Sequence, residues 1–226
     1  MAILGAALGI ISVLITKQKF NVQLPLSSFP LLSLFAAVGF LLATVQIWFM
    51  PNSALSIPAI VFSLLAAFYL ICRGFPSLLK PAAISLLSFC PVIACALLNA
   101  AYYFDTSLEM NSPIKVTLQA TFLFIMLFFT EEIRFSINRA MPRLYATLAI
   151  CTLAASSLCS LPVLLSYLFG TTLHLDYALG ALASGCICIT ICYRLFSLFQ
   201  TSSTISHPTP KEDNTDTNNQ QEDDFA

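Results

Sequence analysis

The sequence predicts an all-α fold, a polytopic transmembrane helical bundle of about seven spans followed by a disordered C-terminal tail. Of its 226 residues, 58% are hydrophobic and 9% are charged, whereas soluble domains have roughly 45–50% and about 25%. Apolar stretches of about 20 residues, long enough to cross a hydrocarbon layer of roughly 30 Å, follow one another with short polar breaks. A soluble core cannot hide that much apolar surface, so lipid is the expected solvent.

The predicted transmembrane domain covers residues 1–200. Its spans lie near residues 2–16, 29–49, 57–72, 82–104, 114–130, 144–169 and 177–199. The first apolar stretch is short, and it has neither the basic start nor the A-x-A site of a cleaved signal peptide. It is therefore a tilted span or an interfacial helix, and the second alternative leaves six crossings.

Basic residues predict the orientation of the bundle. Nine of the ten Lys and Arg residues fall on one side of the predicted membrane, and the other side has only Lys115. Because basic loops are retained in the cytoplasm, the C-terminus is expected inside and the N-terminus outside. With six crossings the N-terminus would lie inside, and the rest of the topology would not change.

Aromatic residues, prolines and small residues add detail to the spans. Trp and Tyr prefer the headgroup level, and those expected there are Trp48, Tyr102, Tyr103 and Tyr177 at the outer rim and Tyr145 and Tyr193 at the inner rim. Pro91 and Pro162 lie within spans, so a kink is expected at each. Pairs of small residues that let helices approach closely are Gly5 with Gly9, Gly180 with Ser184, and Ala181 with Gly185.

The segment 201–226 is rich in Ser, Thr, Asn, Gln and acidic residues. It cannot bury enough apolar surface to fold, so it is predicted to be a disordered cytoplasmic tail. The formal net charge of −1 gives no field that would recruit nucleic acid. The expected partners are the lipid bilayer and a small polar solute or another membrane or cytoplasmic protein.

Signatures of catalysis are missing from the sequence. It contains no H-E-x-x-H, no G-x-S-x-G, no Gly-rich phosphate loop and no C-x-x-C. Charged residues also avoid the span centres, where they would mark a functional site. The eight cysteines lie almost all in apolar runs, where Cys acts as a small packing residue. We therefore expect a protein that is not an enzyme, with no metal and no cofactor.

Three uncharged amides are the first candidates for ligand binding. Gln46, Asn99 and Gln119 come from three different spans and share the outer half of the predicted bilayer. Buried amides need partners, so one interpretation is that they bond across helices and hold the bundle together. The alternative is a polar pocket open to the outside that accepts a small ligand. Its rim would carry Asp105, Lys115, His174 and Asp176.

A second charged segment lies at the predicted inner boundary, between two spans. It contains Glu131, Arg134, Arg139 and Arg143. Glu131 and Arg134 are three residues apart and can pair if the helix continues past the membrane. The segment either marks the boundary by touching lipid headgroups or docks a cytoplasmic partner.

Several short motifs resemble those of multi-spanning proteins of the bacterial plasma membrane. They are Tyr103-Phe104-Asp105, Met110-Asn111-Ser112-Pro113 with Lys115 and Gln119, Glu132-Ile133-Arg134-Phe135, and Pro142-Arg143. The resemblance implies a plasma-membrane location and carries over no activity and no site residue.

Together these patterns predict a non-enzymatic plasma-membrane protein that acts as a small-molecule permease or as a membrane subunit of one. The alternative is an interaction or regulatory subunit whose amides hold the helices together and whose inner loop and tail bind a partner. Gln119→Leu should abolish uptake in the first case and should alter stability at most in the second.

Overall fold

The computed structural model describes residues 30–49, 55–75, 77–106, 112–137, 141–169 and 175–204, and every structural statement below concerns these residues. The helices are α2 (Pro30–Phe49), α3 (Ser56–Gly74), α4 (Pro81–Leu87), α5 (Phe89–Phe104), α6 (Pro113–Ser136), α7 (Pro142–Leu168) and α8 (Leu175–Thr204). Six helical stretches are long and apolar enough to cross a membrane, and one of them joins α4 to α5. The expected all-α bundle is therefore confirmed for six spans, and the first predicted span, near residues 2–16, lies outside the described residues.

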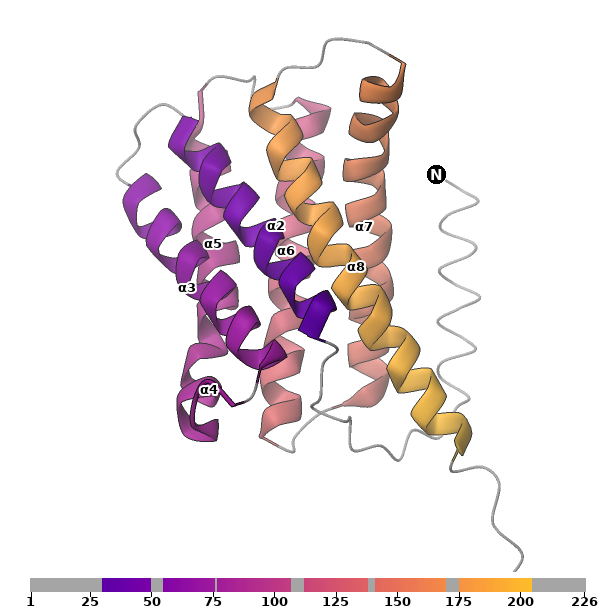
Figure 1. Cartoon of the computed structure of the whole chain (residues 1–226). Coiled ribbons are helices and arrows are strands. Elements are labelled where there is room, and N and C mark those ends of the chain that lie inside the picture. Colours follow the sequence, from indigo (N-terminus) through magenta and orange to yellow (C-terminus); the bar gives the residue numbers. More distant parts are fainter. Residues whose placement is uncertain are drawn as a thin grey trace, which may run out of the picture.

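The six spans form a closed ring (Figure 1). Going round it, α2 packs against α3, α3 against α5, α5 against α6, α6 against α7, α7 against α8, and α8 returns to α2. Short connections make neighbouring helices antiparallel, so the ends of the helices gather at two opposite ends of the ring. In this order α2 faces α6 across the ring, and α5 faces α8.

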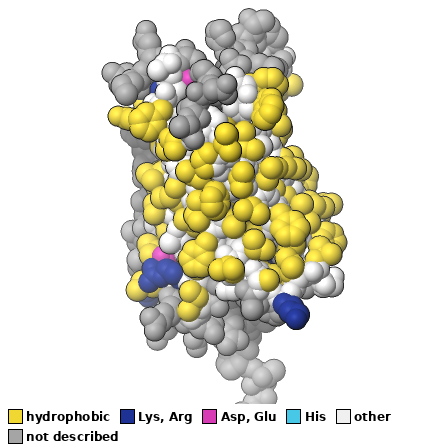
Figure 2. All heavy atoms as spheres, turned by 90° about the vertical axis from the view of Figure 1, so that its left-hand side faces the viewer, with side chains coloured by type: hydrophobic (Ala, Val, Ile, Leu, Met, Phe, Trp, Pro, Cys, Tyr) yellow, Lys and Arg dark blue, Asp and Glu magenta, His cyan; other side chains and the backbone are white. Residues whose placement is uncertain are grey.

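The outer surface of the ring suits lipid. Large apolar side chains such as Val61, Leu64 and Phe68 of α3 are exposed, whereas in a soluble protein such a row would be buried. Figure 2 shows the side of the bundle on which α3 lies, with a broad apolar band and basic side chains near its lower edge. An apolar band bounded by charge is the surface expected of a bundle in a bilayer.

Small residues allow the closest helix contacts. A Cβ on Gly39 of α2 would lie 2.7 Å from the carbonyl oxygen of Ala183 in α8, so only glycine fits there. A Cβ on Gly180 would lie 2.2 Å from Oε1 of Gln46, whereas one on Gly185 would lie 3.2 Å from Cβ of Ser160. The predicted close approach of the last span is confirmed, and it brings α8 against both α2 and α7.

The two prolines within spans behave differently. Residue 88 separates α4 from α5, and Pro91 follows three positions later. The proline ring clashes with the carbonyl four residues earlier, which belongs to Leu87, the last residue of α4. Ser88 eases the break because its hydroxyl donates to the carbonyl of Ser85 at 2.6 Å. By contrast, α7 continues through Pro162 without an interruption.

Three of the expected rim aromatics point into the bundle instead. Trp48 and Tyr103 are 75% and 53% exposed, as an interfacial position requires. Tyr102, Tyr145 and Tyr177 are 0%, 0% and 4% exposed, so they face the interior of the bundle, and their position at the headgroup level stays a prediction. Each of these three phenols contacts other aromatic rings inside the ring of helices.

Candidate functional site

Two polar clusters lie at opposite ends of the helical ring. The first, here called the Lys115 cluster, consists of Gln46, Tyr102, Asp105, Lys115 and Tyr177. The second, called the Glu132 cluster, consists of Tyr69, Arg73, Glu132 and Arg194. Both include contacts between helices that are not neighbours in the ring, α2 with α5 in the first and α3 with α6 in the second, so both reach across its axis.

The Lys115 cluster is a chain of buried contacts. The phenol of Tyr102 donates a hydrogen bond to Oε1 of Gln46 at 2.9 Å. The phenol of Tyr177 donates to the carboxylate of Asp105, and the Lys115 ammonium donates to the backbone carbonyl of Asp105 at 2.6 Å. Asp105 and Lys115 are 7% and 2% exposed, so an anion and a cation are both held inside the protein.

Local structure explains why these residues meet. Asp105 is the residue after α5, and its N–H closes the helix on the carbonyl of Ala101. Lys115 lies in the first turn of α6, which begins with a proline at a position where no N–H is needed. The end of α5 and the start of α6 therefore bring Lys115 back onto Asp105. On α8, the missing side chain of Gly180 leaves the space in which Gln46 and Tyr102 bond.

The other two predicted amides are used differently. With its amide turned so that both groups are satisfied, Asn99 donates to the backbone carbonyl of Gln119 at 2.9 Å and accepts from the N–H of Leu123 at 3.2 Å. It therefore joins α5 to the backbone of α6. Within the described residues, no hydrogen bond links Asn99 or the side chain of Gln119 to the Lys115 cluster. Of the five ligand-binding candidates, the structure brings together Gln46, Asp105 and Lys115.

Two rim candidates fall beyond what the structure describes. His174 lies outside the described residues, and only the backbone of Asp176 is described.

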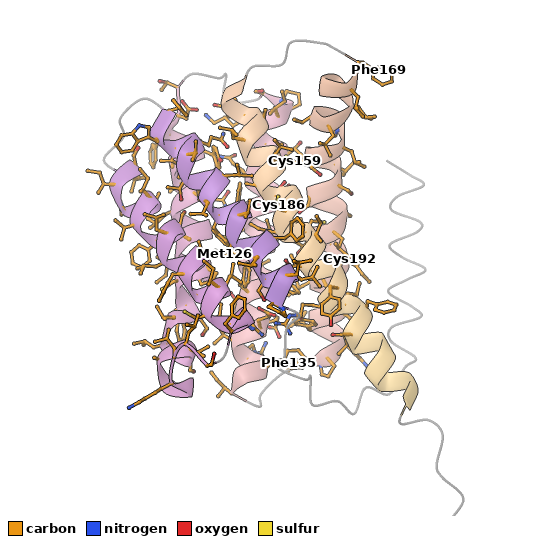
Figure 3. All side chains as sticks on the ribbon, in the orientation of Figure 1. Met126, Phe135, Cys159, Phe169, Cys186 and Cys192 are labelled. Atoms are coloured by element: carbon orange, nitrogen blue, oxygen red, sulfur yellow. The ribbon has the colours of Figure 1, made fainter. Side chains whose placement is uncertain are left out.

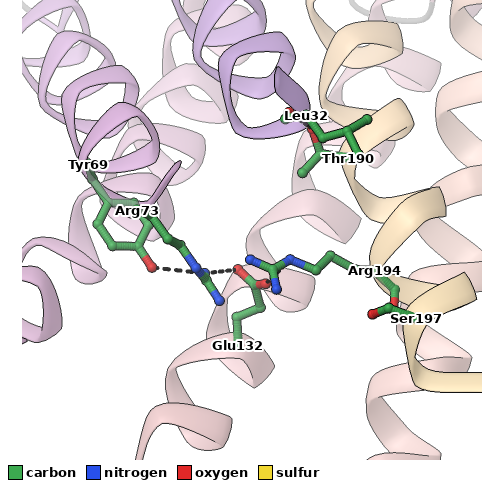
Figure 4. A network of polar contacts seen from close by, with 7 residues as sticks. All are labelled: Leu32, Tyr69, Arg73, Glu132, Thr190, Arg194 and Ser197. Atoms are coloured by element: carbon green, nitrogen blue, oxygen red, sulfur yellow. Dashed lines mark hydrogen bonds and ion pairs between the residues drawn. The ribbon is translucent and has the colours of Figure 1, made fainter. Parts of the chain in front are cut away.

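The Glu132 cluster is a carboxylate between two guanidinium groups. Nη1 of Arg73 donates to Oε2 of Glu132 at 2.6 Å and to the phenol oxygen of Tyr69 at 3.0 Å. Nε of Arg194 lies 3.6 Å from Oε1 of the same carboxylate. The side chains of Arg73, Arg194 and Glu132 keep 14%, 6% and 7% of their surface exposed. Figure 4 shows the two arginines approaching Glu132 from opposite sides.

The partner-docking candidates flank this cluster. Arg134 donates to Oε1 of Glu131 at 2.6 Å, which confirms the predicted pair three residues apart on α6. Arg143 is exposed in the first turn of α7. Arg139 lies outside the described residues. Of the four candidates, Glu131 is 4% exposed, so its carboxylate faces the bundle more than it faces a partner.

Apolar and aromatic side chains fill the axis between the two clusters. Phe40 of α2 meets Phe129 of α6 across the ring, with ring centroids 6.0 Å apart. Nearer the Lys115 cluster, Phe122 stacks on Tyr102 at 5.7 Å. Phe40 and Phe122 are both 0% exposed. Packed apolar side chains therefore occupy the middle of the axis, and polar contacts cross it at both ends.

Six members of the clusters were not recognised as site residues in the sequence, among them Tyr69 and Glu132. Tyr102 and Tyr177 were interpreted as interface markers, and Arg73 and Arg194 as markers of orientation. The signal for Arg194 was its place five residues inside the predicted span 177–199, because charged residues within spans are rare. No comparable signal distinguishes Tyr102 from its exposed neighbour Tyr103.

The cysteines do not assemble into a further site. All eight are free, and Figure 3 shows Cys159, Cys186 and Cys192 at separate heights along α7 and α8. Among the described residues, no group of three His, Cys, Asp or Glu side chains converges as a metal would require.

The ring of apolar helices and its exposed apolar surface define a polytopic α-helical membrane protein. Comparisons of the chain with protein-family models, with curated proteins and with solved structures find no match. The resemblance to bacterial plasma-membrane proteins therefore rests on the short sequence motifs alone.

Proposed function

We propose that the chain is a small-molecule permease, or the membrane subunit of one, whose pathway is closed at both ends. The observation that carries this proposal is that each polar cluster joins helices across the ring axis. At one end Tyr177 of α8 reaches Asp105 at the end of α5. At the other end Glu132 of α6 joins Arg73 of α3 and Arg194 of α8. No catalytic role is assigned to either cluster.

Energetics favour a functional role for these contacts over a purely structural one. Buried ion pairs often contribute less to stability than apolar residues of similar volume, because removing charges from water costs several kcal/mol per ion, as an order of magnitude. Ionisable residues inside membrane proteins are accordingly rare and usually serve function. Polar contacts across the axis can break and reform as the helices move, whereas Phe40 and Phe129 can separate only if the ring opens.

We assign the Glu132 cluster to the cytoplasmic side of the plasma membrane and the Lys115 cluster to the outside. Lys80, Arg134 and Arg143 belong to helix ends that gather at the Glu132 end, and basic segments are retained in the cytoplasm. The expected cargo is small and polar. Gln46 supports this because its Nε2 is buried and has no hydrogen-bond partner among the described residues, so a solute could accept from it.

The test is access to the middle of the axis. A single cysteine replaces Phe40 in a background in which the native cysteines are substituted, and intact cells are treated with a membrane-impermeant thiol reagent. Tyr177→Phe should speed labelling at position 40 about tenfold, because it removes a charge-assisted hydrogen bond that holds the outer end closed. Tyr103→Phe, which changes an exposed phenol at the same end, is the matched control and should leave the rate unchanged.

A cysteine replacing the exposed Trp48 at the same end should label in every background and reports that the protein is folded and accessible. Small polar solutes are then screened for those that slow labelling at position 40, which would identify the cargo class. Equal labelling at position 40 with and without Tyr177→Phe would contradict the proposal.

A second candidate function, an interaction or regulatory subunit, is favoured by one observation. Asn99 bonds to the backbone of α6, as an amide that holds helices together would. Arg134 and Arg143 remain exposed enough to meet a partner, with 38% of the Arg134 side chain accessible. Charge reversal at Arg134 and Arg139 should then detach a protein that co-purifies from native membranes, and labelling at position 40 should stay absent throughout.

A further inference from the structure

The Glu132 cluster contains one more positive charge than its carboxylate neutralises. Arg73 and Arg194 both face Glu132, at 2.6 Å and 3.6 Å. Oε1 of the neighbouring Glu131 pairs with Arg134, whereas its Oε2 is buried without a hydrogen-bond partner among the described residues. Three side chains that are each at least 86% buried therefore carry a net charge of +1. A second buried cation on the same carboxylate is costly unless a further anion accompanies it.

Arg194 supplies unused donors for such an anion. In the described part of the chain, the only ion pair or hydrogen bond of its side chain is the ion pair with Glu132 at 3.6 Å, which exceeds hydrogen-bond distance. The residue is 5% exposed, so its guanidinium lies largely inside the bundle. A guanidinium has five N–H donors in a planar fork, which matches two oxygens of one phosphate or carboxylate group.

Tyr145 offers another donor beside the cluster. Its phenol is fully buried and has no hydrogen-bond partner among the described residues. The ring packs against Phe128 and Phe135 of α6, the helix that carries Glu132, with centroids 4.9 and 4.7 Å apart. Tyr145 lies close enough to the charged triad of this cluster, Arg73, Glu132 and Arg194, for the charges of Glu132 and Arg194 to act on its phenol. A buried hydroxyl of this kind is normally paired, so the Tyr145 phenol is available to donate to a ligand oxygen.

We propose that this end of the ring binds a phosphate-type oxyanion, with Arg194 as the principal contact and Tyr145 as an additional donor. A phosphodiester carries a single negative charge and would bring the triad to neutrality. Arg73 is the penultimate residue of α3, and Glu132 lies four residues before the end of α6, so the site is at headgroup depth. The phosphate can come from an anionic lipid or from a free phosphate compound, and the site does not depend on the proposed permease activity.

The test is thermal unfolding of the full-length protein, stripped of lipid in a non-ionic detergent. The probes are phosphatidylglycerol, zwitterionic phosphatidylcholine and inorganic phosphate. Phosphatidylglycerol should raise the Tm of the wild-type protein more than phosphatidylcholine does, and Arg194→Gln should remove most of that rise. Arg143→Gln, which removes an exposed arginine at the same end, should keep it. Without lipid, Arg194→Gln should fold, because it relieves the repulsion between two guanidinium groups.

The probes separate the two sources of phosphate. A rise with inorganic phosphate alone, lost in Arg194→Gln, supports the oxyanion site with a free phosphate as its ligand. If Arg194→Gln fails to fold, Arg194→Lys replaces it and should weaken binding about tenfold, because an ammonium cannot bond in a bidentate manner. An equal rise in wild type and variant, no rise with any probe, or unchanged affinity in Arg194→Lys would overturn the inference.

Discussion

Glu132→Gln is the substitution most revealing of how the bundle is held together. Glutamine keeps the shape of the side chain but removes the only negative charge between Arg73 and Arg194. The two guanidinium groups then face each other at a site where solvent screens them poorly. We expect a large loss of stability, which comes from the repulsion between the two cations as well as from the lost attraction.

The size of the effect follows from the distances. At an effective dielectric constant of about 20, unit charges at 2.6 Å and 3.6 Å attract by roughly 6 and 5 kcal/mol before desolvation is subtracted. Breaking a buried pair by removing one partner costs about 3–5 kcal/mol net. For a chain of this length that corresponds to a fall in Tm of roughly 6–20 °C.

Glu131→Gln is the matched control, because Glu131 is the adjacent residue and also pairs with one arginine. Its partner Arg134 keeps 38% of its side chain exposed, so solvent screens that pair. The expected cost is at most about 1 kcal/mol. Thermal unfolding of both purified variants in the same detergent gives the comparison.

Adding Arg194→Gln to Glu132→Gln removes one of the two facing cations, so the double variant should recover about 1 kcal/mol or more. If Glu132→Gln destabilises no more than Glu131→Gln, or if the double variant is less stable than Glu132→Gln alone, the account of the triad as a buried charge network is refuted.

Three further substitutions test the remaining contacts by thermal unfolding. Tyr102→Phe should cost about 1–3 kcal/mol because it leaves a buried amide without its donor, whereas Tyr103→Phe should be neutral. Gly180→Ala should cost about 1–3 kcal/mol, because its Cβ would lie 2.2 Å from a buried amide oxygen. Gly185→Ala, with 3.2 Å of room, should cost clearly less, and equal costs would contradict the packing argument. Asn99→Leu should lower the free energy of unfolding by only about 0.6–1.7 kcal/mol, since the α6 backbone retains its own helical bonds. A larger loss would mean that the amide does more than join two helices.

Much of the architecture follows from hydropathy. The second predicted span, 29–49, became Pro30–Phe49, and the last, 177–199, became Leu175–Thr204. A span must match the thickness of the hydrocarbon layer, so its length and composition are strongly constrained. The residue at which a helix ends is less constrained, because polar turns can continue the helix into the headgroup region.

The sequence did not predict how each helix is rotated about its own axis, and therefore which of its side chains face the interior. In lipid both faces of a span are apolar, so periodicity does not tell which face points inward. Tyr102 and Tyr103 are adjacent and chemically identical, yet one is buried and the other is 53% exposed. For the same reason Gln46 joins the Lys115 cluster, whereas Asn99 turns to the backbone of α6.

Because α2 and α8 close the ring, the bundle can be completed only after the last helix has been inserted into the membrane. Of the described helices, α2 leaves the ribosome first and α8 last, yet Gly39 fits against the carbonyl of Ala183, and the hydroxyl of Thr190 donates to the carbonyl of Leu32 at 2.6 Å. Until α8 is inserted, that face of α2 must be shielded by lipid or by the insertion machinery. A chain that stops before α8 should therefore be recognised by membrane quality control as an unfinished protein and degraded.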